Sequence, residues 1–164
     1  MKHLIKQFMR RDAHPLVQFI KYGMAGGIAT VVDTLIFYTL SWKVFPGLGD
    51  DDPVVNVLGI SVTAVSEAIR SRNYVINRAI TFLFSNLVAY ILNMLWVFTP
   101  GRHNRWVEVG LFYLVSVTSY FIGTFVGWFL IWKFELSTTV AFLANVVAAL
   151  LINYVCRKYV IFKG

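Results

Sequence analysis

Four long apolar runs constrain this chain more than any other feature. They lie at about residues 17–42, 80–98, 109–132 and 140–155. A helix of about 20 apolar residues crosses the hydrocarbon core of a bilayer, and the last, shortest run reaches that length if its helix continues toward Tyr159. Only 14% of the 164 residues are charged, whereas soluble domains average about 25%. We therefore expect a single-domain, all-α membrane protein with four transmembrane helices over residues 1–164.

Lysine and arginine predict how these helices are oriented. Four crossings put both termini and the loop at residues 99–108 on one side, which then carries ten of the 15 Lys and Arg residues. Cytoplasmic ends are enriched in these residues, so both termini are predicted to be cytoplasmic. Contact with anionic lipids accounts for the net charge of +7 without a nucleic-acid partner.

Two segments outside the runs are predicted to be surface helices. In the charged N-terminal stretch, apolar residues recur at helical spacing at Leu4, Ile5, Phe8 and Met9. This pattern indicates an interfacial amphipathic helix. Between the first two runs, apolar residues recur in the same way at Val55, Leu58, Val62, Val65 and Ile69. They predict an amphipathic helix in the outer segment 46–79.

Asp33 lies inside the first apolar run, and no other Asp or Glu falls inside any of the four runs. A carboxylate at membrane depth costs several kcal/mol, so Asp33 is a candidate functional residue. The structural alternative is a helix-packing carboxyl group that is protonated or bonded to a buried donor. At 1.5 Å per residue, Asp33 lies about 20 Å along the helix from Phe19.

Asparagines extend this polar feature into two predicted layers. Asn86 and Asn145 fall at a depth similar to that of Asp33, and a second layer nearer the cytoplasm holds Asn93, Asn153 and Tyr154. Each amide could simply bond helix to helix, which contributes about 0.6–2 kcal/mol. Taken together with Asp33, they favour a polar path through the bundle.

Basic residues border the predicted cytoplasmic ends of the helices, at Arg102, Arg105, Arg157 and Lys158. Arginine can bind phosphate through two parallel hydrogen bonds and lysine through its point charge. The alternative is that these residues set the topology and contact lipid headgroups. Arg78, at the outer end of the second run, is predicted to lie apart from both layers, as an interfacial anchor or as a group that receives phosphate after transfer.

Nothing in the sequence indicates catalysis. The three histidines, His3, His14 and His103, lie in tails or loops, and the single Cys156 excludes an internal disulfide and a cysteine metal cluster. We therefore predict a protein that is not an enzyme and has no catalytic residues, metal or cofactor.

The two halves of the chain are also alike. Residues 85–98 and 144–162 are both Asn-bearing apolar runs with an aromatic-rich end, and aligning Asn86 with Asn145 leaves five extra residues in the second half. Both predicted helices cross in the same direction, so the repeat would be parallel.

Three stretches of this chain resemble the GtrA-like family of small four-helix membrane proteins of bacterial cell-surface polysaccharide synthesis. They are QFIKYGMAGGIATVVDTLIFY at 18–38, NLVAYILNMLWVF at 86–98 and NYVCRKYVIF at 153–162. The family's Gly-rich start followed by an acidic residue is matched by Gly23, Gly26, Gly27 and Asp33. Its Asn-Tyr…Arg…aromatic-x-Phe ending is matched by Asn153, Tyr154, Arg157, Tyr159 and Phe162.

This resemblance implies translocation of a polyprenyl-phosphate-linked monosaccharide from the cytoplasmic to the outer leaflet of the bacterial inner membrane. The asparagines would then bond sugar hydroxyls, the cytoplasmic cations would bind the phosphate, and Asp33 would bond hydroxyls or couple a protonation change to transport. Expected partners are this lipid, anionic membrane lipids, further copies of the chain and a membrane glycosyltransferase.

Two other functions stay open. One is a non-transporting membrane anchor for a polyprenyl-sugar synthase or glycosyltransferase. The other is a small multidrug-type, proton-coupled exporter, against which the cytoplasmic cations and abundant asparagines argue.

Overall fold

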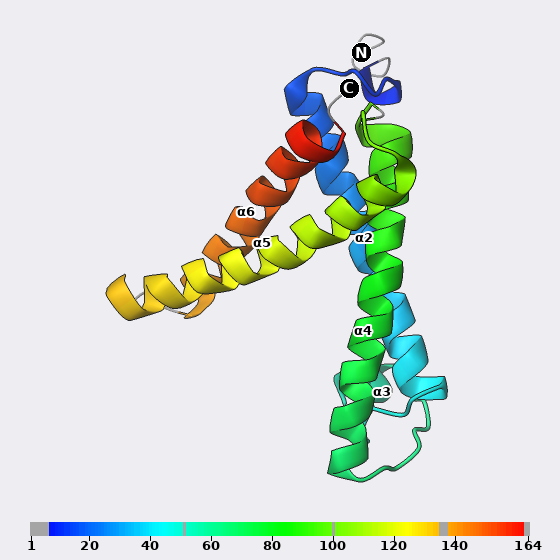
Figure 1. The fold of residues 1–164 in the computed structure, drawn as a ribbon. Coiled ribbons are helices and arrows are strands. Elements are labelled where there is room, and N and C mark those ends of the chain that lie inside the picture. Colours follow the sequence, from blue (N-terminus) through cyan, green and yellow to red (C-terminus); the bar gives the residue numbers. More distant parts are fainter. Residues whose placement is uncertain (1–6, 51, 100, 135–137, 163–164) are drawn as a thin grey trace. The chain divides into compact units, whose positions relative to one another are not determined.

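The computed structural model describes residues 7–50, 52–99, 101–134 and 138–162, which form helices and connecting segments with no strand among them (Figure 1). The helices are α2 (Pro15–Lys43), α3 (Pro53–Leu58), α4 (Glu67–Leu92), α5 (Arg105–Phe134) and α6 (Thr138–Cys156). A five-residue π-helical turn continues α4, as η1 (Asn93–Val97), and another continues α6, as η2 (Arg157–Ile161).

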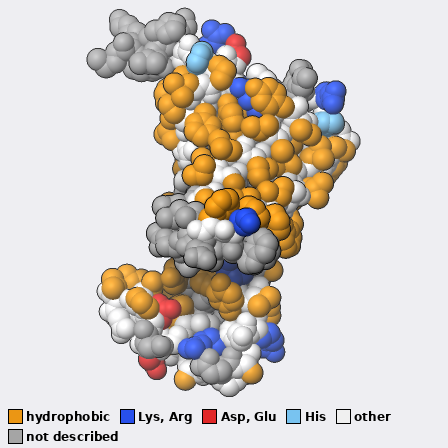
Figure 2. Space-filling view, turned by 90° about the vertical axis from the view of Figure 1, so that its left-hand side faces the viewer, with side chains coloured by type: hydrophobic (Ala, Val, Ile, Leu, Met, Phe, Trp, Pro, Cys, Tyr) orange, Lys and Arg blue, Asp and Glu red, His pale blue; other side chains and the backbone are white. Residues whose placement is uncertain are grey.

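Three stretches of the described helices are long and apolar enough to cross a membrane: Pro15–Lys43, Ala68–Val97 and Arg105–Val126. Their large apolar side chains face outward, with Leu35 63% and Phe121 66% exposed. Figure 2 shows hydrophobic side chains over much of the visible surface. Lipid tails solvate such a surface, so the prediction of an all-α membrane protein is confirmed. The predicted fourth run falls in α6, whose side chains are described only in part.

The helices begin and end beyond their predicted bounds. α4 begins at Glu67 rather than Ile80, and α5 begins at Arg105 rather than Val109. η2 carries the last helix on to Ile161, which provides the length that the shortest run needed. The earlier start of α5 also brings Glu108 into a helix, so Asp33 is not the only acidic residue in the long apolar helices.

The continuous outer helix predicted over residues 55–69 is wrong. α3 ends at Leu58, because Gly59 adopts a left-handed conformation with φ of 60° and caps the helix. Residues 60–66 are not helical, and their β-branched side chains favour this break. The predicted N-terminal amphipathic helix falls largely on residues 1–6, which lie outside those described; residues 7–9 are helical.

The chain packs as two compact units, one of residues 25–89 and one of residues 1–24 with 90–164. In the unit of residues 25–89, a row of buried polar residues recurs at every fourth position of α4: Asn73, Asn77, Thr81 and Ser85. Asn77 Nδ2 donates to Ser41 Oγ at 2.9 Å and to the Phe45 carbonyl at 3.0 Å. Asn73 Nδ2 donates to the Pro46 carbonyl at 2.8 Å. This row, which we call the polar seam, fixes α4 against the end of α2 and the loop after it.

In the other unit, α5 and α6 pack side by side (Figure 1). Both π-helical turns close in the same way, because the Phe98 amide donates to the Asn93 carbonyl and the Phe162 amide to the Arg157 carbonyl, each at 2.9 Å. The Phe98 and Phe162 rings then stack, with centroids 5.3 Å apart. This shared ending supports the internal repeat. It aligns Phe98 with Phe162 in place of Asn86 with Asn145, and this alignment needs no five-residue insertion.

The loop before α5 passes close to the end of η2 at Gly101. A Cβ atom there would collide with the Ile161 carbonyl oxygen and lie 3.1 Å from Glu108 Oε1. The Gly101 amide also donates to Glu108 Oε1 at 3.2 Å. Only a residue without a side chain allows this approach.

Replacing Asn77 by Leu should lower the free energy of unfolding by about 1–3 kcal/mol, because the substitution leaves Ser41 and the Phe45 carbonyl without their donor. Thermal denaturation of the detergent-solubilised protein, followed by circular dichroism, measures this. Asn56→Leu, at an exposed position of α3, is the matched control and should leave the midpoint unchanged. Equal midpoints for both variants would contradict the anchoring role of Asn77.

Replacing Gly101 by Ala should destabilise the unit of residues 1–24 and 90–164 by about 1–3 kcal/mol, the usual cost of overpacking. Gly110→Ala is the control, since a Cβ at Gly110 meets nothing within 4 Å. The same thermal denaturation compares the two. If Gly101→Ala unfolds at the wild-type temperature, the loop does not need this close contact.

Candidate functional site

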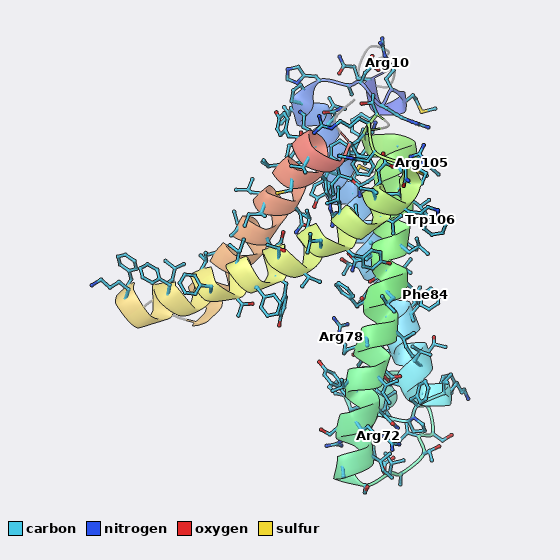
Figure 3. The ribbon with its side chains drawn as sticks, viewed as in Figure 1. Arg10, Arg72, Arg78, Phe84, Arg105 and Trp106 are labelled. Carbon is cyan, nitrogen blue, oxygen red and sulfur yellow. The ribbon has the colours of Figure 1, made fainter. Side chains whose placement is uncertain are left out.

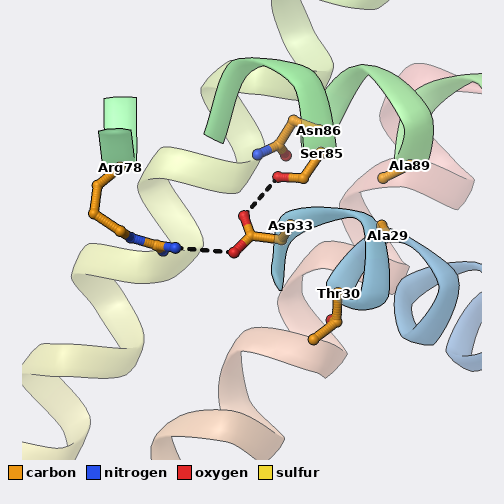
Figure 4. Close-up of a pocket in the computed structure, with 7 residues that line it drawn as sticks. All are labelled: Ala29, Thr30, Asp33, Arg78, Ser85, Asn86 and Ala89. Atoms are coloured by element: carbon orange, nitrogen blue, oxygen red, sulfur yellow. Dashed lines mark hydrogen bonds and ion pairs between the residues drawn. The ribbon is translucent and has the colours of Figure 1, made fainter. Parts of the chain in front are cut away.

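An ion pair joins α2 and α4 inside the unit of residues 25–89 (Figure 4). Arg78 Nη1 donates to Asp33 Oδ2 at 2.9 Å. Ser85 Oγ donates to the other carboxylate oxygen, also at 2.9 Å. Both oxygens of Asp33 therefore have a donor, which offsets the cost of a charge within an apolar helix.

The same three side chains line an open pocket of about 210 Å³, together with Ala29, Thr30, Asn86 and Ala89 (Figure 4). The Asn86 amide donates to the Phe82 carbonyl at 3.0 Å and the Thr30 hydroxyl to the Gly26 carbonyl at 3.0 Å. Their side-chain oxygens can still accept hydrogen bonds. The pocket thus offers a guanidinium for an anion and several polar groups for hydroxyls. Asp33 and Asn86, predicted at similar depth, do share it.

Arg78 was predicted to lie apart from both polar layers, but this prediction is wrong, because Arg78 pairs with Asp33. Arg78 and Ser85 are seven residues apart and so lie on the same face of α4, two turns from each other. That spacing was the signal available in the sequence. It was missed because Arg78 lies just before the predicted start of its helix.

An aromatic ring also lies against the Arg78 guanidinium, whose place on α4 is labelled in Figure 3. Its central carbon lies 5.6 Å from the centroid of the Phe37 ring, and Phe37 makes an edge contact with Tyr74 at 5.7 Å. Cation–π attraction is worth about 0.5–2 kcal/mol. Arg78 is therefore oriented from two sides while its side chain stays 46% exposed.

Arg157 occupies a second cationic site, in the unit of residues 1–24 and 90–164. It is 7% exposed, and its guanidinium carbon lies 3.7 Å from the centroid of the Phe112 ring. Its nitrogens donate to Ser116 Oγ at 2.8 Å and to the Tyr22 hydroxyl at 3.3 Å. Within the described residues no carboxylate pairs with it, and its Nε has no hydrogen-bond partner. Aromatic faces and hydroxyls, rather than an acidic partner, stabilise this charge.

The predicted neighbours of Arg157 bond mostly to the helices themselves. Asn153 Nδ2 donates to the Ala149 carbonyl at 2.8 Å. The Tyr154 hydroxyl donates to the Pro15 carbonyl at 3.1 Å and accepts from Lys158 Nζ at 3.3 Å. Tyr154 thus connects the start of α2 to the end of α6.

Glu108 is a buried carboxylate that the sequence placed in a loop. It is 1% exposed and accepts from Arg105 Nη1 at 2.9 Å and from the Tyr90 hydroxyl at 3.1 Å. Arg105, labelled at the start of α5 in Figure 3, is thus engaged by a carboxylate. Its interaction with Glu108 fixes the first turn of α5.

The remaining predicted site residues differ in exposure. Asn93 is buried in η1 at 1% exposure, and Arg102 is exposed in the loop before α5. The side chain of Asn145 lies outside the described residues. Among the residues that the structure describes, there is no group of three or more His, Cys, Asp or Glu that could hold a metal ion.

Replacing Arg157 by Lys should lower the free energy of unfolding by about 1–3 kcal/mol, because lysine keeps the charge but loses the planar contact with Phe112 and the fork to Ser116 and Tyr22. Arg102→Lys, at an exposed position, is the matched control. Thermal denaturation in detergent distinguishes them, and equal midpoints would show that the guanidinium shape is unimportant.

Comparison with known proteins identifies a family. Residues 21–162 match the family described as GtrA/DPMS, transmembrane domain. No curated protein matches the chain, and no solved structure matches it either. The match includes both cationic sites and agrees with the resemblance found in the sequence motifs. It associates the protein with membrane processes that use polyprenyl-phosphate-linked sugars. The chain therefore belongs to the GtrA/DPMS transmembrane-domain family.

Proposed function

We propose that this protein translocates a polyprenyl-phosphate-linked monosaccharide from the cytoplasmic to the outer leaflet of the bacterial inner membrane. The observation that carries the proposal is the pocket of Asp33, Arg78, Ser85 and Asn86, formed between two apolar helices. An ion pair beside hydroxyl and amide groups suits a ligand that combines a phosphate with a sugar. The membership of the family supports the same class of ligand.

In this proposal the chain crosses the membrane four times with both termini in the cytoplasm. α6 with η2 provides the fourth crossing, and the excess of Lys and Arg on the cytoplasmic side orients it. Arg102, Arg105, Arg157 and Lys158 then border the cytoplasmic leaflet, where the substrate enters. Asn93, Asn145, Asn153 and Tyr154 contribute polar groups nearer this entrance. The isoprenoid tail stays in lipid throughout.

No covalent bond changes in this process, so we propose a transporter rather than an enzyme. Further copies of the chain, anionic lipids and a membrane glycosyltransferase that uses the product are the proposed partners. The exporter alternative needs an unpaired carboxylate for a cationic drug. The ion pair of Asp33 with Arg78 argues against it.

Reconstitution into liposomes with an undecaprenyl-phosphate-linked glucose tests translocation. The wild-type protein should bring the sugar to the opposite leaflet, where a membrane-impermeant glycosidase or periodate can reach it. Arg78→Gln should reduce the initial rate by about tenfold or more, the value of one charge-assisted hydrogen bond.

Arg72→Gln is the matched control, because Arg72 is an exposed arginine of the same helix, outside the pocket (Figure 3). It should keep the wild-type rate. No accessible sugar with any variant, the wild type included, would overturn translocation. Capture of a glycosyltransferase that persists in Arg78→Gln would then favour the anchor.

A further inference from the structure

The Asp33–Arg78 pair is electrically neutral and isolated from other charges of its two helices. Asp33 is the only charged residue of α2 from Tyr22 to Trp42, and α4 has none from Ala79 to Leu92. Arg78, directly before the second stretch, and Asp33, inside the first, place one positive and one negative charge beside the pocket. Any further charge that enters must therefore be balanced there.

The geometry of the pair also allows another anion to replace Asp33 as the partner of Arg78. Arg78 contacts Asp33 through one nitrogen and one oxygen, at 2.9 Å. A guanidinium has five N–H donors, so this single contact uses a small part of its capacity. A phosphate can engage two of these donors at once, one more than Asp33 engages here. Both side chains line the pocket, and Arg78 is the more exposed of the two.

A polyprenyl-phosphate-linked sugar carries its phosphate as a diester, with one negative charge. If this anion joined Arg78 while Asp33 stayed ionised, two negative charges would share one positive charge inside apolar helices. Like charges in such surroundings disfavour each other strongly. One of the two must lose its charge, and a phosphodiester is far too acidic to take up the proton.

We propose that the phosphodiester displaces Asp33 from Arg78 and that Asp33 takes up one proton as it leaves. This proposal rests on the proposed function only in its choice of ligand. The proton comes from the buffer acid in the surrounding solution, which is left as its conjugate base; it forms an O–H bond on the Asp33 carboxylate, and the phosphodiester itself is unchanged. Release of the ligand reverses both steps, so the pocket binds the lipid-linked anion and a proton together.

Ser85 allows Asp33 to adopt both states. Its hydroxyl donates to the ionised carboxylate at 2.9 Å. The same hydroxyl can rotate and accept a hydrogen bond from the neutral acid. Asp33 therefore keeps a partner after it loses Arg78.

Proton uptake on binding tests the proposal directly. The probe is a farnesyl-phosphate-linked glucose, added to the purified full-length protein in detergent and followed by titration calorimetry. The heat is measured near pH 7, about the pH at which ordinary carboxyl groups are ionised, in two buffers of different ionisation enthalpy. The wild-type protein should take up about one proton per bound ligand, as linkage requires of a group that gains a proton.

Asp33→Asn supplies a permanently neutral side chain and should bind the probe with no proton uptake. Asp33→Glu keeps a carboxyl group and should restore the uptake. Arg78→Gln should weaken binding by about tenfold or more, whereas Arg72→Gln should match the wild type. Absence of proton uptake in the wild type, uptake that persists in Asp33→Asn, or loss of binding in both Asp33 variants would each overturn the exchange.

The assay separates this exchange from translocation, because it measures binding alone. Proton uptake without sugar transfer in liposomes would overturn the proposed function and leave the exchange standing. Sugar transfer without proton uptake would do the opposite.

Discussion

The ion pair between Asp33 and Arg78 is the constraint on which the packing of α2 and α4 depends. A lone charge in an apolar helix is costly, so each partner fixes the place of the other. The hydrogen bonds that uncharged side chains make between α2 and α4 fit the same alignment of the two helices. Asp33 meets Ser85, and eight residues further along α2 Ser41 meets Asn77, eight residues back along α4. Because the contacts advance by eight residues along α2 and go back by eight along α4, the two helices are antiparallel and have one fixed alignment.

Three of the charges in or beside the apolar helices, those of Asp33, Glu108 and Arg157, are stabilised in different ways. Asp33 and Glu108 each accept from an arginine and a hydroxyl. Arg157 instead lies against the Phe112 ring and bonds to hydroxyls. Because Arg157 is 7% exposed and the Arg78 side chain 46%, an anion can reach Arg78 without opening the packing. Of these two cations, Arg78 is thus the accessible one, and its partner is the carboxylate of Asp33.

Hydropathy and spacing were enough to predict the helical membrane fold and the proximity of Asp33 to Asn86. They could not predict Arg78 as the partner, because the polar residues from 67 to 79 lower the hydropathy of a segment that is nevertheless helical. The buried positions of Asn73 and Asn77 could not be predicted for the same reason. Glu108 looked like a loop residue because its burial depends on Tyr90 and Arg105, which a linear pattern does not bring together. Gly59 ends the predicted outer helix by adopting a left-handed conformation, which the regular spacing of apolar residues does not reveal.

The internal repeat explains why the second half has no counterpart of Arg78 and Ser85 in its sequence. In the register set by Phe98 and Phe162, the tyrosines Tyr90 and Tyr154 also correspond, each eight residues earlier. Further back the halves diverge, since Arg78 corresponds to Phe142 and Ser85 to Ala149. The second half therefore keeps the aromatic ending but lacks an arginine and a serine at the positions that correspond to Arg78 and Ser85. The shared ending is suited to a packing role in both halves, whereas the residues of the charged pocket occur in the first and are replaced by Phe142 and Ala149 in the second.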